Sequence, residues 1–122
     1  MAPKQRSVPK MIKSETSPFL IILVTCPTRT VGRRIAAALI TRHLAACVNI
    51  VPGVESIFWW QGKMDRCREV LLLIKTTTRR FESLKRAVIS LHPYDVPEVI
   101  ALPIVAGHRA YLKWVTTSVI SR

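Results

Sequence analysis

Apolar and polar positions follow two different periods along this chain, and each change of period marks an element. Residues 19–26 (FLIILVTC) form a continuous apolar run closed by Pro27, which is typical of a buried central strand. Residues 47–60 and 68–76 are also rich in β-branched and aliphatic side chains, and a shorter run at 99–104 resembles them. The sequence therefore predicts four strands.

Between these runs, apolar residues recur at helical spacing. A helix is predicted from Thr28, which can cap its first turn, to about His43. A second helix is predicted from Phe81 until Pro93 stops it, and a short last helix follows Gly107. The order β-α-β-β-α-β with a trailing helix predicts an α+β, ferredoxin-like fold, whose antiparallel sheet has its first and third strands in the centre.

The second strand is predicted to be much longer than the first. Extended at about 3.3 Å per residue, residues 47–60 reach roughly 45 Å, against about 26 Å for residues 19–26. Pro52-Gly53 predicts a bulge on an edge strand, and Gln61-Gly62 turns the chain into the third strand. The resulting hairpin must overhang the sheet.

The far end of this hairpin is apolar on both faces, because successive side chains of a strand alternate. Its apolar residues are Ile57, Phe58, Trp59 and Trp60. A small domain has little surface with which to cover them, so we predict that they form the interface of a closed ring of subunits. The alternative is a hairpin folded back on its own helices.

Charge and composition narrow the functional classes. The net charge is +12, and residues 1–18 supply three of these charges, so nine remain on residues 19–122, which we expect to form one domain. Residues 1–18 lack the apolar centre of a secretory signal and are interpreted as a mobile basic tail, with a transit peptide as the alternative. No apolar run approaches the length of a membrane span, so we expect a soluble protein.

The cysteines Cys26, Cys47 and Cys67 are odd in number, lack CxxC spacing and follow no secretion signal, which indicates reduced thiols in an intracellular, cytoplasmic protein. Thiolate and imidazole ligands suit copper and zinc. The predicted topology brings Cys26 and His92 to one end of the sheet and Cys47 to the other. It also places Cys67 opposite roughly Ser56, too far from Cys47 for a disulfide.

Our metal hypothesis is therefore Cys26 with His92, joined by Asp95, Glu98 or groups of a second subunit. The alternative makes Cys26 a small buried hydrophobe and His92 a residue that contacts the end of its helix. Cys47, between Ala46 and Val48, is interpreted as a core residue.

Six motifs in register resemble one known family. They are VTCP, LAACVNIVPGVESI, GKM, EVLLLIKT, LHPYDVPEVIALPI and YLKW, within about residues 19–119. The chain resembles the CutA family of divalent-cation tolerance proteins. This resemblance implies a homotrimer similar to the PII signalling proteins, with hairpins that embrace neighbouring subunits, and binding of divalent metals, copper foremost, without an established catalytic reaction.

The sequence departs from the pattern of that family at two places. Where the family often reads Tyr-x-Trp-Glu-Gly-Lys, residues 58–63 read Phe-Trp-Trp-Gln-Gly-Lys, which removes a phenol and a carboxylate. Asp95 also replaces a more usual glutamate, so the negative charge is kept on a shorter side chain.

Three further classes compete with a metal-response protein. A PII-like sensor would bind a small anionic metabolite in clefts between subunits, lined by His92 and by Tyr94, Asp95, Glu98, Lys75 and Trp60. Catalysis is not expected, because no nucleophile motif or phosphate-binding glycine loop accompanies the acid and base groups of residues 92–98. Specific nucleic-acid binding is not expected either, because the strands present aliphatic rather than stacking side chains.

Overall fold

A computed structural model describes residues 17–120 of the chain. The tail expected at residues 1–18 therefore lies largely outside the described residues. Its last two residues are held by the fold: the Ser17 hydroxyl donates to the Ile104 carbonyl (2.9 Å), and the Pro18 carbonyl accepts from the Thr78 amide (3.0 Å).

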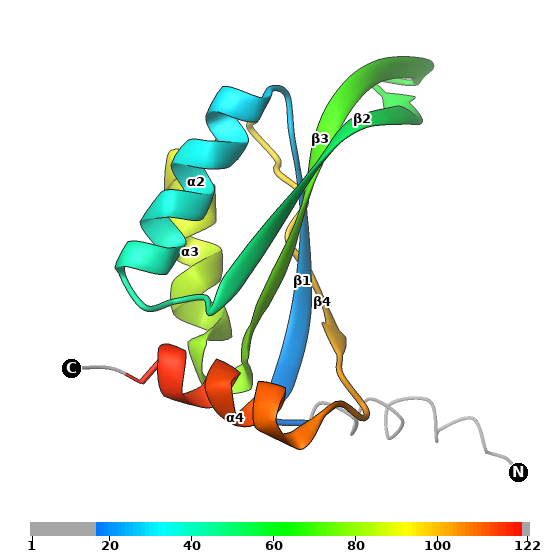
Figure 1. The fold of residues 1–122 in the computed structure, drawn as a ribbon. Helices are drawn as coiled ribbons and strands as arrows, with labels where there is room; N and C mark the ends of the chain where they lie inside the picture. The colour runs from blue at the N-terminus through cyan, green and yellow to red at the C-terminus, as the bar shows by residue number, and fades with distance from the viewer. Residues whose placement is uncertain (1–16, 121–122) are drawn as a thin grey trace, which may run out of the picture.

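The described residues form a four-stranded antiparallel sheet in the order β2-β3-β1-β4, as Figure 1 shows. Its strands are β1 (Phe19–Cys26), β2 (Cys47–Trp60), β3 (Lys63–Thr77) and β4 (Ile100–Pro103). The first and third strands occupy the centre, so the predicted ferredoxin-like α+β fold is confirmed. The third strand begins at Lys63 rather than at Arg68, because the polar residues after the turn pair with β2 along its whole far end.

Two helices pack against one face of this sheet, and a third crosses its lower end in Figure 1. The helices are α2 (Arg29–Thr41), α3 (Phe81–Leu91), preceded by the 3-10 turn η3 (Thr78–Arg80), and α4 (Arg109–Ser118). The Thr28 hydroxyl caps α2 by accepting from the Val31 amide (3.2 Å), as predicted.

Helix α2 ends two residues before the predicted His43. His43 adopts a positive φ of 57°, and the Leu44 amide donates back to the Leu39 carbonyl (2.9 Å), which closes the helix with a left-handed residue. Glycine or asparagine usually takes that position, so the sequence held no ordinary signal for this helix end.

The hairpin between β2 and β3 overhangs the sheet, because β1 pairs with β3 only as far as Cys26 and Val70. The register shifts between Val51 and Val54, which confirms the bulge predicted at Pro52-Gly53. Gln61 and Gly62 both have positive φ values (50° and 77°), as a two-residue hairpin turn requires. The long predicted hairpin is therefore confirmed.

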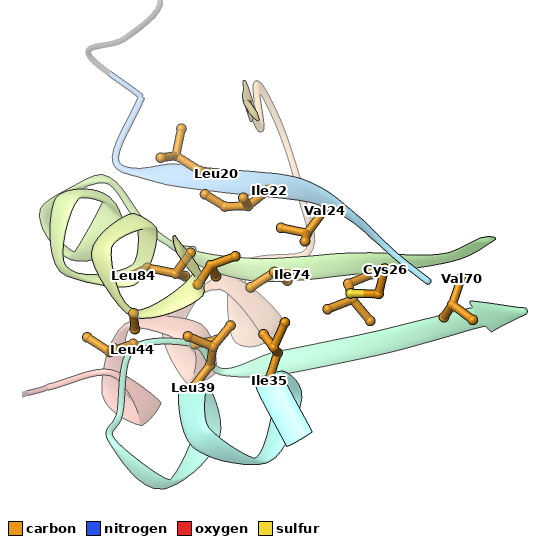
Figure 2. Close-up of a cluster of buried hydrophobic side chains, with 14 residues drawn as sticks. Leu20, Ile22, Val24, Cys26, Ile35, Leu39, Leu44, Val70, Ile74 and Leu84 are labelled. Carbon is orange, nitrogen blue, oxygen red and sulfur yellow. The ribbon is translucent and has the colours of Figure 1, made fainter. Parts of the chain in front are cut away.

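The core lies between the sheet and helices α2 and α3. Figure 2 shows Leu20, Ile22 and Val24 of β1 facing this layer, with Cys26 at its end. The opposite sheet face is also apolar, but the described residues cover it incompletely: Ile100 and Leu102 of β4 remain 50% and 49% exposed. The sheet thus has a covered face and an open face, which carries the odd-numbered residues of β1 and β3.

Candidate functional site at the end of strand β1

His92 caps α3 and anchors its end to β1. Its Nε2 lies 2.7 Å from the Thr25 carbonyl oxygen, and its Nδ1 lies 3.1 Å from the Tyr94 amide. A carbonyl can only accept and an amide N–H can only donate, so Nε2 carries the proton and Nδ1 accepts. The ring is therefore neutral and nearly buried, and both nitrogens have protein partners.

Cys26 lies on the covered face, one residue beyond the strand carbonyl that His92 contacts. Its side chain is completely buried, which, with a smaller contribution from the negative charge of Glu69, raises the pKa of the thiol to about 11. Metals bind the thiolate, so a metal ion at Cys26 would have to displace a tightly held proton.

Tyr94 joins this end of the sheet to a buried carboxylate. Its hydroxyl donates to Glu69 Oε2 (2.7 Å), and its ring packs on the His92 ring with centroids 4.7 Å apart. Burial first, and then this hydrogen bond and the neighbouring negative charges, raise the pKa of the tyrosine. Tyr94 therefore remains a hydrogen-bond donor to a carboxylate that is only 7% exposed.

The negative charge of Glu69 also acts on two further groups. Partial desolvation and then this charge raise the carboxyl pKa of Glu98, although Glu98 itself lies at the surface. Desolvation and then the Glu69 and Asp65 charges raise the thiol pKa of Cys67. We call Glu69, His92, Tyr94 and Glu98 the Glu69 cluster. The central member was missed from the sequence, where its only signal is a glutamate that opens the apolar run EVLLLIKT.

The structure distributes the other predicted ligand residues along the sheet. Asp95 is exposed on the loop beside Tyr94. Lys75 pairs with Cys47 and Ile21, six residues along β3 from Glu69, or roughly 20 Å at about 3.3 Å per residue. Trp60 pairs with Lys63, a similar distance in the other direction. One subunit therefore does not bring Lys75, Trp60 and Tyr94 together.

The three cysteines are free in the described chain, and one prediction about them was wrong. Cys47 is not a core residue: it is half-buried on the open face, because Val48 and Ile50 of the same strand take the core positions. Cys67 pairs with Ser56, as predicted. Within residues 17–120, no three His, Cys, Asp or Glu side chains are grouped so as to hold a metal ion.

The chain is thus a small α+β protein with a ferredoxin-like sheet, an overhanging apolar hairpin and a hydrogen-bonded cluster of His, Tyr and Glu side chains. Part of its apolar surface is not covered by the described residues themselves. The family model described as CutA1 divalent ion tolerance protein matches residues 20–118. The chain therefore belongs to the CutA1 family.

Individual relatives agree with this assignment. The divalent-cation tolerance protein CutA of Thermus thermophilus is 55% identical over 94 residues, which cover 77% of this chain and 91% of the relative. The chloroplastic CutA 1 of Oryza sativa is 49% identical over 105 residues, 86% of this chain but only 59% of the relative's length.

Solved structures agree with the fold as well. The Thermus thermophilus protein superposes with a TM-score of 0.81 at 52% identity, over 82% of this chain and 97% of that one. The Oryza sativa protein gives 0.81 at 48% identity, over 85% and 95%. None of the helices within residues 17–120 has the length and apolar character needed to cross a membrane.

Proposed function

We propose that the chain is a homotrimeric metal-response protein that binds divalent cations, copper foremost, and contributes to metal tolerance without catalysing a reaction. The family and the name of the Thermus thermophilus relative support divalent-cation tolerance. The proposed assembly rests on the exposed apolar hairpin tip, where Ile57 and Trp59 are 62% and 78% exposed.

Self-association follows from the apolar surface that one subunit leaves uncovered. The hairpin tip and the open face of the sheet are continuous through β2 and β3, and exposed apolar surface of this kind is typical of protein interfaces. The family resemblance supports three subunits. Light scattering at micromolar concentration is expected to give about three times the chain mass of 13.8 kDa.

A matched pair of substitutions tests which surface assembles. Ile57→Asp places a charge on the hairpin, and Ile89→Asp places the same charge on α3, where the isoleucine is 49% exposed. We expect the hairpin variant to dissociate, because a buried unpaired charge is costly, and the helix variant to keep the wild-type mass. A monomeric wild type, or equal behaviour of the two variants, would contradict the proposed interface.

The proposed metal ligands are His92 and Cys26, supplemented by Asp95, Glu98 or a neighbouring subunit. For His92 to bind a metal, a ring nitrogen must exchange its Thr25 or Tyr94 partner for the ion. We expect copper titrations of His92→Ala and Cys26→Ser to show affinities lowered about 10-fold or more relative to wild type. Equal affinity in all three proteins would remove this site.

A second proposed function is a PII-like sensor of a small anionic metabolite. It is supported by two features that disfavour metal binding: both His92 nitrogens already have protein partners, and the Cys26 thiol is protonated. In this proposal, a trimer would bring Lys75 and Trp60 of neighbouring subunits toward Tyr94 in a shared cleft. Native mass spectrometry followed by parallel screens of metals and metabolites separates the two functions, because only the sensor would retain an anion in the absence of metal.

We propose a cytoplasmic location, which the three free cysteines support. The relatives from Oryza sativa and Arabidopsis thaliana are named chloroplastic, which supports organellar targeting as the alternative. Imaging of the full chain with a C-terminal fluorescent fusion distinguishes the two locations.

A further inference from the structure

A second polar group lies at the end of the sheet far from the Glu69 cluster. Cys47 of β2 and Lys75 of β3 are direct partners in the strand register. The Lys75 ammonium lies 3.8 Å from the Cys47 sulfur and also donates to Asn49 Oδ1. The same amide oxygen lies 4.0 Å from the thiol. The lysine nitrogen and the thiol are thus held side by side.

The backbone around this pair is regular, which fixes the spacing at which the two side chains leave the sheet. The Ala46 amide donates to the Lys75 carbonyl (2.9 Å) at the start of β2, and pairing continues through Val48 and Ile74. Directly opposed residues of an antiparallel pair have Cβ atoms about 4.5–5.5 Å apart on the same face. The contact is therefore built into the register rather than dependent on a mobile loop.

We propose that Cys47 and Lys75 form a reversible oxidative cross-link, a nitrogen–sulfur bond made when a hydroperoxide oxidises the thiol. This modification site is separate from the proposed metal function and does not depend on it. The other two thiols are placed differently: Cys26 is fully buried in the core, and Cys67 faces Ser56 across the hairpin.

The chemistry has two balanced steps. In the first, the Cys47 thiolate attacks one peroxide oxygen, the O–O bond breaks, and the sulfur is oxidised to a sulfenic acid while the peroxide is reduced to water. In the second, the uncharged Lys75 amine attacks that sulfur, the N–S bond forms and the S–O bond breaks. The hydroxide released takes the amine proton and leaves as a second water. A dithiol reductant returns the free thiol and amine.

The cross-link changes the end of the open face that lies farthest from the hairpin tip, where Asn49 is exposed and Cys47 and Lys75 are half-buried. A small peroxide can reach this polar end even when a neighbouring subunit covers the apolar part of the face. The cross-link removes the positive charge of Lys75 and ends the donation to Asn49 Oδ1. It also ties β2 to β3 covalently near Tyr111, whose hydroxyl pKa is raised by burial and then by the neighbouring Cys47. Oxidation would therefore alter the charge of this face without a change of fold.

Peptide mapping of the full-length protein after hydrogen peroxide treatment tests the proposal. Trypsin should release residues 43–63 joined to residues 69–79, uncut at Lys75, with a combined mass two hydrogens below that of the separate peptides. The product should vanish with dithiothreitol, which reduces the N–S bond.

Four variants make the assignment specific. Cys47→Ser and Lys75→Arg should lack the product, since serine has no oxidisable sulfur and the guanidinium stays charged. In Lys75→Arg, the unreacted sulfenic acid should give several-fold more labelling of Cys47 by dimedone than in wild type. Cys67→Ser and Lys85→Arg, a lysine paired with Glu82 at 3.0 Å, should behave as wild type.

Circular dichroism before oxidation checks that all variants are folded. Equal dimedone labelling of Cys47 in wild type and Lys75→Arg, without the cross-linked peptide, would overturn the proposal. So would a disulfide between Cys47 of two chains, or peroxide that modifies Cys67 and leaves Cys47 a free thiol.

Discussion

The covered and open faces of the sheet are built from the same kinds of side chain, but they differ in what lies against them. On the covered face, Ile22, Leu72 and Ile74 are completely buried beneath α2 and α3. On the open face, Leu71 and Leu73 of β3 are only half-buried, and the edge strand β4 exposes about half of Ile100. Strands that are apolar on both sides are typical of sheets buried on both sides. The proposed association would supply the second layer that the open face lacks.

The largest effect on stability should come from shortening Leu72 or Leu73, two neighbouring leucines whose side chains lie on opposite faces of the sheet. Leu72→Ala removes a fully buried side chain and leaves a cavity, so we expect it to lower the free energy of unfolding by about 2–5 kcal/mol. Leu73→Ala removes the same atoms from the open face, where part of the stabilisation would come from the proposed association. Urea unfolding at several protein concentrations measures both effects.

The dependence of these two losses on protein concentration distinguishes the covered face from the open face. The loss in Leu72→Ala should already be present in the isolated subunit, whereas the loss in Leu73→Ala should grow as the protein becomes concentrated enough to assemble. Equal losses at all concentrations would mean that each subunit covers its own open face, and the proposed second layer would be wrong.

A polar exception on the open face gives the next effect. Glu69 shares the face of Leu71 and Leu73 but is buried, and the Tyr94 hydroxyl donates a hydrogen bond to its carboxylate. Tyr94→Phe leaves that carboxylate without the donor, so we expect a loss of about 1–3 kcal/mol in chemical unfolding. A neutral Tyr94→Phe would show that the carboxylate finds water instead.

The two faces also show why the fold could be predicted better than the site. Periodicity located the four strands and the three α-helices, because apolar runs and prolines are local signals, and the strand lengths predicted that the hairpin would overhang the sheet. The same apolar run could not reveal that Glu69 would be buried, since its partner Tyr94 lies 25 residues away in sequence. Cys47 was misplaced for a related reason: apolar neighbours on both sides do not say which face of an edge strand is covered.

His92 and Lys75 also show which contacts could not be predicted from the sequence. The topology correctly predicted that His92 would lie beside the end of β1, but its two hydrogen bonds depend on a backbone carbonyl and an amide that no sequence pattern marks. Lys75 was predicted to join Tyr94 in a cleft between subunits, which one chain does not test, whereas its contact with Cys47 within the chain was not foreseen. Chemical type therefore gave candidates, and only the register decided which of them meet.

The last effect concerns Cys26, a core residue of the covered face whose thiol can ionise. Burial raises the pKa of the Cys26 thiol from 9.0 to about 11, so the folded chain binds this proton more tightly than the unfolded chain. The resulting stabilisation is complete below about pH 9 and is lost as the pH rises toward 11, with a slope of at most about 1.4 kcal/mol per pH unit. Chemical unfolding under reducing conditions from pH 8 to 11 should show this decline. Cys26→Ala should make this decline shallower than Cys67→Ala does, because the half-exposed Cys67 thiol is desolvated less on folding than the Cys26 thiol. Parallel curves for the two variants would show that Cys26 ionises as readily in the folded protein as in the unfolded one, and that the covered face is open to water at its hairpin end.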